Sequence, residues 1–204
     1  MGRPSREEAE RIGGAILDAA TEMFLAEGYG ATSIEALAQR LRISKRTFYH
    51  RHKDKAALFE AVVRSVVGKL KPPDVPGLFV GGSLEEILLR IGEVALAAAT
   101  SPSAVALQRL LLSESARFPE LAAIASGEGT RQMAVEAIAR LLDGKMPPGE
   151  ARFAGEQFLQ MVISLPQRRA MGLGEPMAAE EHRAWVRRTV SLFLHGCLHR
   201  EARG

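Results

Sequence analysis

Apolar residues recur every three or four positions along almost the whole chain, and this spacing limits the fold more strongly than any other feature of the sequence. Ile12, Ile16 and Ala20 form one such stripe, which is typical of a helix with one buried face. We find no run that alternates apolar and polar residues as a half-buried strand does. The sequence therefore predicts an all-α protein.

A break in composition divides the predicted helices into two groups. Residues 71–82 contain three prolines and three glycines, and such a segment cannot continue a helix. We place the domain boundary here, which predicts an N-terminal domain of residues 1–71 and a C-terminal domain of residues 72–204. With 47% apolar and 25% charged residues, the chain has the composition of an ordinary globular protein.

Local start and stop signals give approximate limits for the helices of the C-terminal domain. Ser83 and Glu86 form a capping box that opens an apolar helix reaching about Thr100. Proline or glycine begins, splits or interrupts the helices that follow, and Pro166 must bend or end the helix that contains it. These positions are Pro102, Pro119, Gly127, Gly129, Pro148 and Pro166, and a last long helix begins near Met177.

The stretch from Thr32 to His50 carries the clearest functional signal. It predicts two very short helices, one after Ser33 and one after Ser44, joined by a tight turn. A pair this short needs a third helix for burial, and the stripe that starts at Ile12 supplies it. This arrangement is a helix-turn-helix, in which the first residues of the second helix are offered to the major groove of DNA.

Positive charge is concentrated around the same stretch. Residues 40–55 hold seven basic residues and one acidic residue, and residues 1–71 have a net charge of +4 while the remainder has −1. Such a cluster is either a solvated charged face or a phosphate-binding surface. The pair of short helices favours the phosphate-binding surface.

The residue types of the second short helix suit DNA recognition. Arg46 can pair with guanine through two hydrogen bonds, Thr47 can contact a thymine methyl, and Lys45 can reach a base or a phosphate. Other polar residues nearby are placed to hold the flanking phosphates, which sets the register without reading the sequence. They are Tyr49, His50 and Lys55.

The N-terminal sequence resembles that of the tetracycline-repressor (TetR) family of transcription regulators. The resemblance spans about residues 8–62 and is carried by the run from Thr47 to Phe59, together with Phe24, Gly28-Tyr29, Thr32-Ser33, Leu37-Ala38 and Ile43-Ser44. A second, shorter stretch resembles the C-terminal domain of the AefR-like repressors. It runs from Arg109 to Leu121.

The resemblance implies a homodimer that represses transcription from a pseudo-palindromic operator and is released by a small-molecule effector. The implied base contacts are Lys45, Arg46 and Thr47, in the helix that Ser44 opens. The implied phosphate contacts are Ser33, Tyr49, His50 and Lys55. An activator would share all of these residues, so the direction of regulation stays open, as do the effector and the operator sequence.

Two positions depart from the family pattern. Arg42 stands where the family usually has glycine, and a non-glycine residue costs about 1–2 kcal/mol in the left-handed backbone region. His52 stands where the family favours a buried aromatic residue, and a neutral imidazole there needs a partner for its N–H. We expect the fold to tolerate both departures.

Two long helices near the end of the chain are apolar on more than one side. A helix of this kind buries one side in its own domain and another against a partner. We therefore expect the helices around residues 151–165 and 185–198 of two chains to pack as a twofold four-helix bundle. A monomeric core is the alternative. The predicted interface residues are Phe158, Val162, Leu165, Val190 and Leu194.

The sequence gives no support to an enzyme, a cofactor or a metal site. Phosphate-binding glycine loops, a serine nucleophile elbow and paired acidic residues are absent, which argues against a helical enzyme, and the basic cluster argues against a purely structural adaptor. His195 and His199 lie four residues apart, but no H-E-x-x-H acid accompanies them.

The sequence also predicts the compartment. No window approaches the roughly 18 apolar residues of a membrane helix, so we expect no membrane partner. Cys197 is the only cysteine, and the first residues do not form a signal peptide. We expect a cytoplasmic protein.

Overall fold

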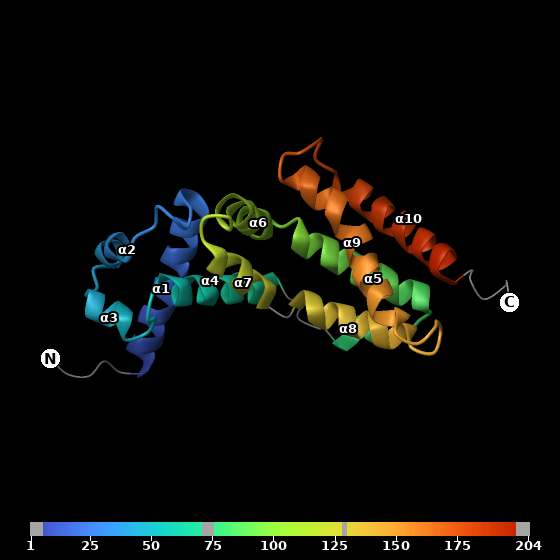
Figure 1. Cartoon of the computed structure of the whole chain (residues 1–204), viewed down its shortest axis with the longest axis horizontal. Coiled ribbons are helices and arrows are strands. Elements are labelled where there is room, and N and C mark those ends of the chain that lie inside the picture. The colour runs from blue at the N-terminus through green and yellow to red at the C-terminus, as the bar shows by residue number, and fades with distance from the viewer. Residues whose placement is uncertain (1–5, 71–75, 128–129, 199–204) are drawn as a thin grey trace. The chain divides into compact units, whose positions relative to one another are not determined.

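The computed structural model of the chain describes residues 6–70, 76–127 and 130–198. Within these residues it contains ten α-helices, one short 3-10 helix and no strand (Figure 1). The prediction of an all-α fold is confirmed.

The described residues form two compact units. The head unit contains the residues up to Lys69 together with those of Ala106–Glu128, and the C-terminal unit contains those of Leu70–Val105 and those from Gly129 onward. The predicted division between residues 71 and 72 placed the whole of 106–128 in the C-terminal domain. In the structure this segment groups with the head unit, where Glu114, Phe118 and Glu120 contact Tyr29 and Gly30.

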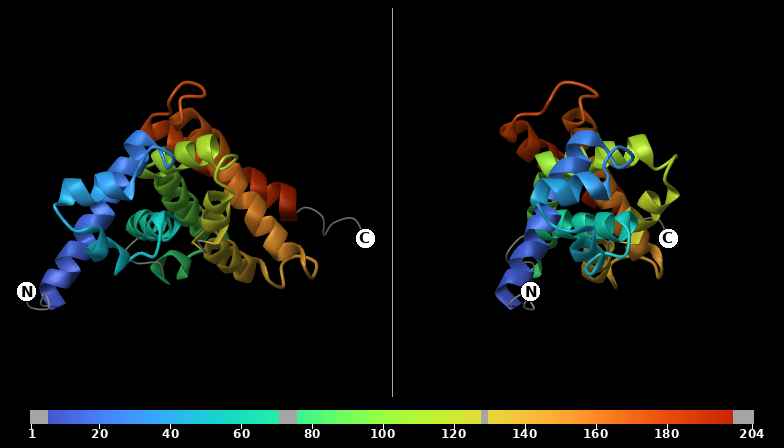
Figure 2. Two further views of the ribbon diagram at one scale, coloured as in Figure 1. Left: turned by 60° about the vertical axis from the view of Figure 1, so that its left-hand side comes forward. Right: turned by 90° about the vertical axis from the view of Figure 1, so that its left-hand side faces the viewer.

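Four helices make up the N-terminal part of the head unit. They are α1 (Arg6–Glu27), α2 (Ile34–Leu41), α3 (Lys45–Tyr49) and α4 (Lys55–Leu70). α2 packs against α1, and α3 packs against α2 (Figure 2). Phe24, Phe48 and Phe59 are fully buried, and the rings of Phe24 and Phe59 meet edge to face with centroids 5.3 Å apart. This small aromatic core gives the two short helices the burial that they need to be stable.

Apart from the 3-10 helix at Pro76–Phe79, which the sequence did not predict, the remaining helices begin at or close to the predicted positions. Pro102 and Pro119 each open a helix, as expected, and the helix that Pro119 opens ends at Gly127. The elements are η1 (Pro76–Phe79), α5 (Leu84–Ala99), α6 (Pro102–Glu114), α7 (Pro119–Gly127), α8 (Thr130–Leu142), α9 (Glu150–Ala170) and α10 (Ala179–Leu198).

The start of α5 shows both bonds of the predicted capping box. The hydroxyl of Ser83 accepts a hydrogen bond from the amide of Glu86 at 3.2 Å, and the carboxylate of Glu86 accepts one from the amide of Ser83 at 2.6 Å. Hydrogen bonds from the backbone amide and the side chain of Ser83 to the carboxylate lower the pKa of Glu86. Two amides that the helix leaves without partners are satisfied in this way.

The core of the C-terminal unit lies between α5, α8, α9 and α10. Leu88, Phe158 and Phe193 are buried there, and α9 and α10 run side by side (Figure 1). Gly92 allows α10 to approach α5 closely, since a Cβ at this position would lie 2.7 Å from a methyl carbon of Val186. The C-terminal unit therefore has a closely packed helical core.

Candidate nucleic-acid interface

Two serines start the helices of the candidate DNA-reading unit. The hydroxyl of Ser33 accepts a hydrogen bond from the amide of Ala36 at 3.0 Å and opens α2. The hydroxyl of Ser44 accepts one from the amide of Thr47 at 3.1 Å and opens α3. Both caps agree with the sequence-based expectation, and they set where each short helix begins.

The turn between these helices keeps its left-handed geometry without glycine. Arg42 has φ 53° and ψ 39°, and it is the only non-glycine residue with positive φ in the described chain. Its amide bonds to the carbonyl of Gln39 at 3.1 Å, and the amide of Ile43 bonds to the carbonyl of Ala38 at 3.0 Å. The fold thus accepts the cost of about 1–2 kcal/mol and leaves the Arg42 side chain exposed beside α3.

The three predicted base-reading residues lie in the first turn of α3 and differ in the contacts that their side chains make. The ammonium of Lys45 forms an exposed ion pair with Glu35 of α2, and their hydrogen bond raises the pKa of Lys45 and lowers that of Glu35. The hydroxyl of Thr47 lies 2.8 Å from that of Ser44. Arg46 is exposed, and no hydrogen bond or ion pair within the described residues engages its guanidinium.

The end of α3 carries the predicted phosphate contacts. Tyr49 is 51% exposed, and its ring packs edge to face against that of Phe48 with centroids 5.3 Å apart. His50 is exposed beside it. A polar group that is held in place but open to solvent can donate to a phosphate without first breaking an internal bond.

His52 fills the position where an aromatic ring was expected. It is half-buried, and its ring lies 5.7 Å from that of Phe48. Burial lowers the pKa of His52, and the positive charge of Arg51 lowers it further. The imidazole therefore substitutes for the aromatic residue in its neutral form.

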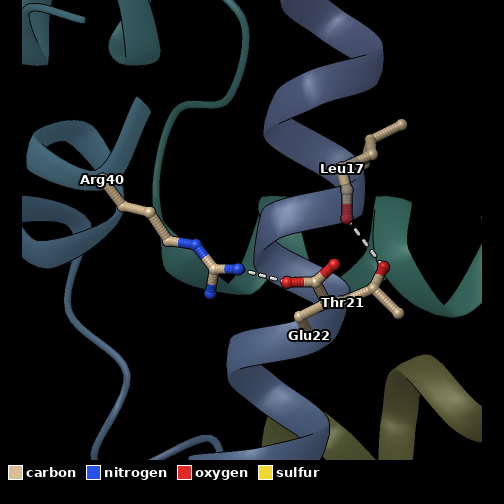
Figure 3. Close-up of polar contacts among 4 residues, drawn as sticks. All are labelled: Leu17, Thr21, Glu22 and Arg40. Carbon is tan, nitrogen blue, oxygen red and sulfur yellow. Dashed lines mark hydrogen bonds and ion pairs between the residues drawn. The ribbon is translucent and has the colours of Figure 1, made fainter. Parts of the chain in front are cut away.

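Two arginines of the basic cluster fasten the head instead of projecting freely. Arg40 of α2 forms an ion pair with Glu22 of α1 (Figure 3). Arg51 donates to the backbone carbonyl of Ala9, and it does so across Gly13, where a Cβ would lie only 3.0 Å from its guanidinium. In the sequence both arginines are recognisable only as positive charge, because their partners are distant along the chain.

Lys55 also has a structural role that the sequence did not predict. Its ammonium donates to the carbonyl of Thr32 at 2.7 Å and to that of Gly30 at 3.3 Å, and it lies 4.6 Å from the centroid of the Tyr29 ring. Burial lowers the pKa of Lys55. The ammonium thus holds the turn before Ser33, and its role as a phosphate contact stays a prediction.

The predicted dimer interface needs a correction. Phe158, Val162 and Val190 have no exposed surface, because they lie in the core of the C-terminal unit. They cannot meet a partner chain as expected. Of the five residues only Leu165 and Leu194 keep partial exposure. The five residues were predicted from their apolar character alone, which does not show which side of each helix faces the core of its own domain. The large apolar side chains that α9 and α10 expose are Phe153, 58% exposed, and Leu192, 64% exposed.

The described residues contain no group of three or more histidines, cysteines or acidic residues that could hold a metal ion. His199 lies outside them, so the spacing of the two histidines near the end of the chain is not described. No single described helix is long and apolar enough to cross a membrane, although α5 and α6 taken together, across the break between them, pass by length and composition.

Two family models match the chain. Residues 16–62 match bacterial regulatory proteins of the tetR family, and residues 86–196 match the C-terminal domain of the AefR-like transcriptional repressors. Among curated proteins, the uncharacterized HTH-type transcriptional regulator YdeS of Bacillus subtilis (strain 168) is 31% identical over 88 residues. That match covers 43% of this chain and 40% of that protein, so the chain spans less than half the length of this relative.

Solved structures extend the similarity over almost the whole chain. A protein from Mesorhizobium loti MAFF303099, described as a TetR-family transcriptional regulator, matches with a TM-score of 0.76 and 24% identity, over 95% of this chain and 98% of that one. The flavonoid-responsive regulator FrrA matches with a TM-score of 0.74 and 26% identity, over 94% and 99%. The chain therefore shares the fold of these regulators over almost its whole length.

Proposed function

The chain belongs to the TetR family of bacterial transcriptional regulators, with an AefR-like C-terminal domain, and we propose that it binds a pseudo-palindromic operator as a homodimer and represses transcription until a small molecule releases it. Operator binding places its action in the cytoplasm.

One observation supports operator binding more than any other. The first turn of α3 exposes Arg46, which has no partner among the described residues and lies between the N-cap residue Ser44 and the exposed Tyr49. A free guanidinium at the start of a recognition helix is suited to a bidentate contact with guanine. Exposed polar groups on either side then fix the helix on the phosphates.

The effector acts by differential binding to two states of the dimer. A ligand that binds more tightly to the state in which the two heads do not fit one operator lowers DNA affinity by the ratio of its two affinities. The similarity to the flavonoid-responsive FrrA makes a flavonoid the first class of compound to test.

Selection of bound duplexes from a random pool tests the proposal. We expect the recovered sequences to share two inverted half-sites with centres about one helical turn apart, ~34–36 Å. Recovery of no common sequence would contradict operator binding. A common sequence without inverted repeats would contradict the homodimer.

The direction of regulation and the effector need a second measurement. Transcription in vitro from a promoter that carries the recovered site should fall when the protein is added and recover when a flavonoid is added. A rise on addition of the protein would identify an activator instead. A library of small molecules screened for release of the bound duplex would replace the flavonoid if it has no effect.

A further inference from the structure

The turn between α1 and α2 is held from two sides within the head unit. It comprises residues 28–32, and Ser33 follows it directly. On one side the ammonium of Lys55 binds two of its carbonyls. On the other side the turn contacts the junction of α6 and α7, which lies about 80 residues further along the chain.

Glu114, the last residue of α6, makes the most direct contact from that junction. One carboxylate oxygen accepts a hydrogen bond from the amide of Gly30 at 2.7 Å. The other oxygen occupies the space beside Gly28, where a Cβ would collide with it. Gly28 also has φ +92°, a backbone conformation that favours glycine, and a Cβ at this position would displace the carboxylate.

Phe118 and Glu120 complete the contact. The ring of Phe118 lies 4.9 Å from that of Tyr29, and a Cβ on Gly30 would lie 3.3 Å from the same ring. The hydroxyl of Tyr29 donates to a carboxylate oxygen of Glu120 at 3.3 Å. Burial, together with the nearby negative charge, raises the pKa of Tyr29 to about 12, so the hydroxyl keeps the proton that it donates.

We propose that Glu114 is a positioning residue for operator binding: its carboxylate, supported by Phe118, fixes the turn that places Ser33 and the start of α2 on the DNA backbone. This inference rests on the proposed function. Its physical basis is that the amide of Gly30 needs an acceptor when it is partly buried, and that Glu114 supplies one from a helix outside the helix-turn-helix.

The position of the turn determines the position of Ser33, and therefore which phosphate its hydroxyl can contact. The hydroxyl of Ser33 caps α2, and α2 in turn packs against α3. When the amide of Gly30 loses its acceptor, the turn can relax toward water and carry the start of α2 with it. The hydrogen bonds to phosphate that set the register then form less well, and base contacts by α3 suffer with them.

The test compares Glu114→Ala with Glu114→Gln, because glutamine keeps a side-chain oxygen that can accept from Gly30. The probes are the tightest duplex recovered from a random pool and a scrambled duplex of equal length. We expect Glu114→Ala to bind the recovered duplex about tenfold more weakly, which corresponds to about 1.4 kcal/mol. We expect Glu114→Gln to stay within about twofold of the wild type, and the scrambled duplex to be affected less than the recovered one.

Two further measurements separate positioning from general stability. Hydrogen exchange at the amide of Gly30 should be slow in the wild type and in Glu114→Gln and faster in Glu114→Ala. The matched control is Glu60→Ala, which removes an exposed glutamate that pairs with Arg64 on α4 and does not touch the turn. Glu60→Ala should leave DNA binding and the exchange of Gly30 unchanged.

These measurements distinguish a failure of the role of Glu114 from a failure of operator binding itself. Wild-type binding by Glu114→Ala, or an equal loss on both duplexes together with a lowered unfolding temperature, would overturn the role of Glu114. If the wild type itself prefers no duplex, the proposed function fails. The exchange at Gly30 then decides separately whether Glu114 holds the turn.

Discussion

The indole Nε1 of Trp185 donates a hydrogen bond to the backbone carbonyl of Val162 at 3.0 Å. This carbonyl would normally accept from the amide four residues later in α9, but that residue is Pro166, which has no N–H. Trp185 of α10 therefore supplies the donor that the proline removes. The sequence predicted that Pro166 would either bend or end its helix. α9 continues through Pro166 to Ala170, so the proline does not end it.

A double-mutant cycle tests this compensation. Trp185→Phe should destabilise the C-terminal unit by about 1–3 kcal/mol, because the carbonyl of Val162 loses its partner in a packed interior. The loss should be smaller when Pro166 is also replaced by alanine, since the restored amide can bond to Val162. Denaturant unfolding of the four proteins measures the coupling. Strictly additive losses would show that the two residues are independent.

The helix limits were predictable because they are set by neighbouring residues. Ser33, Ser44 and Ser83 each start a helix with a side-chain bond to an amide three residues later, and such caps are visible in the sequence alone. The prolines at 102 and 119 act in the same local way. The fold class and most element boundaries follow from signals of this range.

The parts of the site that the sequence did not predict depend on contacts between residues that are distant along the chain. Glu114 meets Gly30 across 84 positions of sequence, and no local pattern marks the pair. Lys55 looked like a free cation, and only the folded chain shows its ammonium on the turn. Phe158 and Val190 failed as interface residues for a related reason, because an apolar stripe does not tell which side faces the domain's own core.

The pH dependence of stability should reflect His52. Its pKa in the folded head lies below the ordinary value of about 6.5 that applies to the unfolded chain, so the unfolded state binds more protons near that pH. The contribution of neutral His52 to the free energy of unfolding is therefore fully present above about pH 6.5 and is lost as the pH falls below that value. In His52→Phe this loss should be absent. The difference in free energy of unfolding between the two proteins should grow from pH 7.5 to pH 5.5, and a constant difference would show that His52 is not kept neutral.

Dimerisation should depend on the exposed apolar side chains of α9 and α10. Leu192→Glu places a charge on the face that we assign to the partner chain, and it should yield monomers of 22.1 kDa in sedimentation equilibrium, where the wild type gives twice that mass. Leu173→Glu is the matched control, because Leu173 is similarly exposed but lies between the helices. Phe158→Glu is unsuitable, since it would disrupt the core. A wild type that stays monomeric while folded would refute the interface.

DNA binding should weaken steeply with salt. Each phosphate that the protein neutralises adds about −0.9 to the slope of log affinity against log salt, so three or more contacts by each of the two heads of the dimer give about −5.4 or steeper. Lys53→Ala removes an exposed cation of the basic cluster from each head of the dimer, so it should flatten the slope by about two units on any duplex. Lys145→Ala, in the C-terminal unit, should leave it unchanged. A wild-type slope near zero would exclude a phosphate-binding surface.

The central claim is that α3 reads bases through Arg46, and the affinity of Arg46→Ala for two duplexes tests it most directly. On the duplex recovered by selection, Arg46→Ala should lose about 1–3 kcal/mol of binding free energy and relax the base preference at one position in each half-site. On a scrambled duplex its affinity should stay close to that of the wild type. An equal loss on both duplexes would contradict the claim, because it would make Arg46 a phosphate contact.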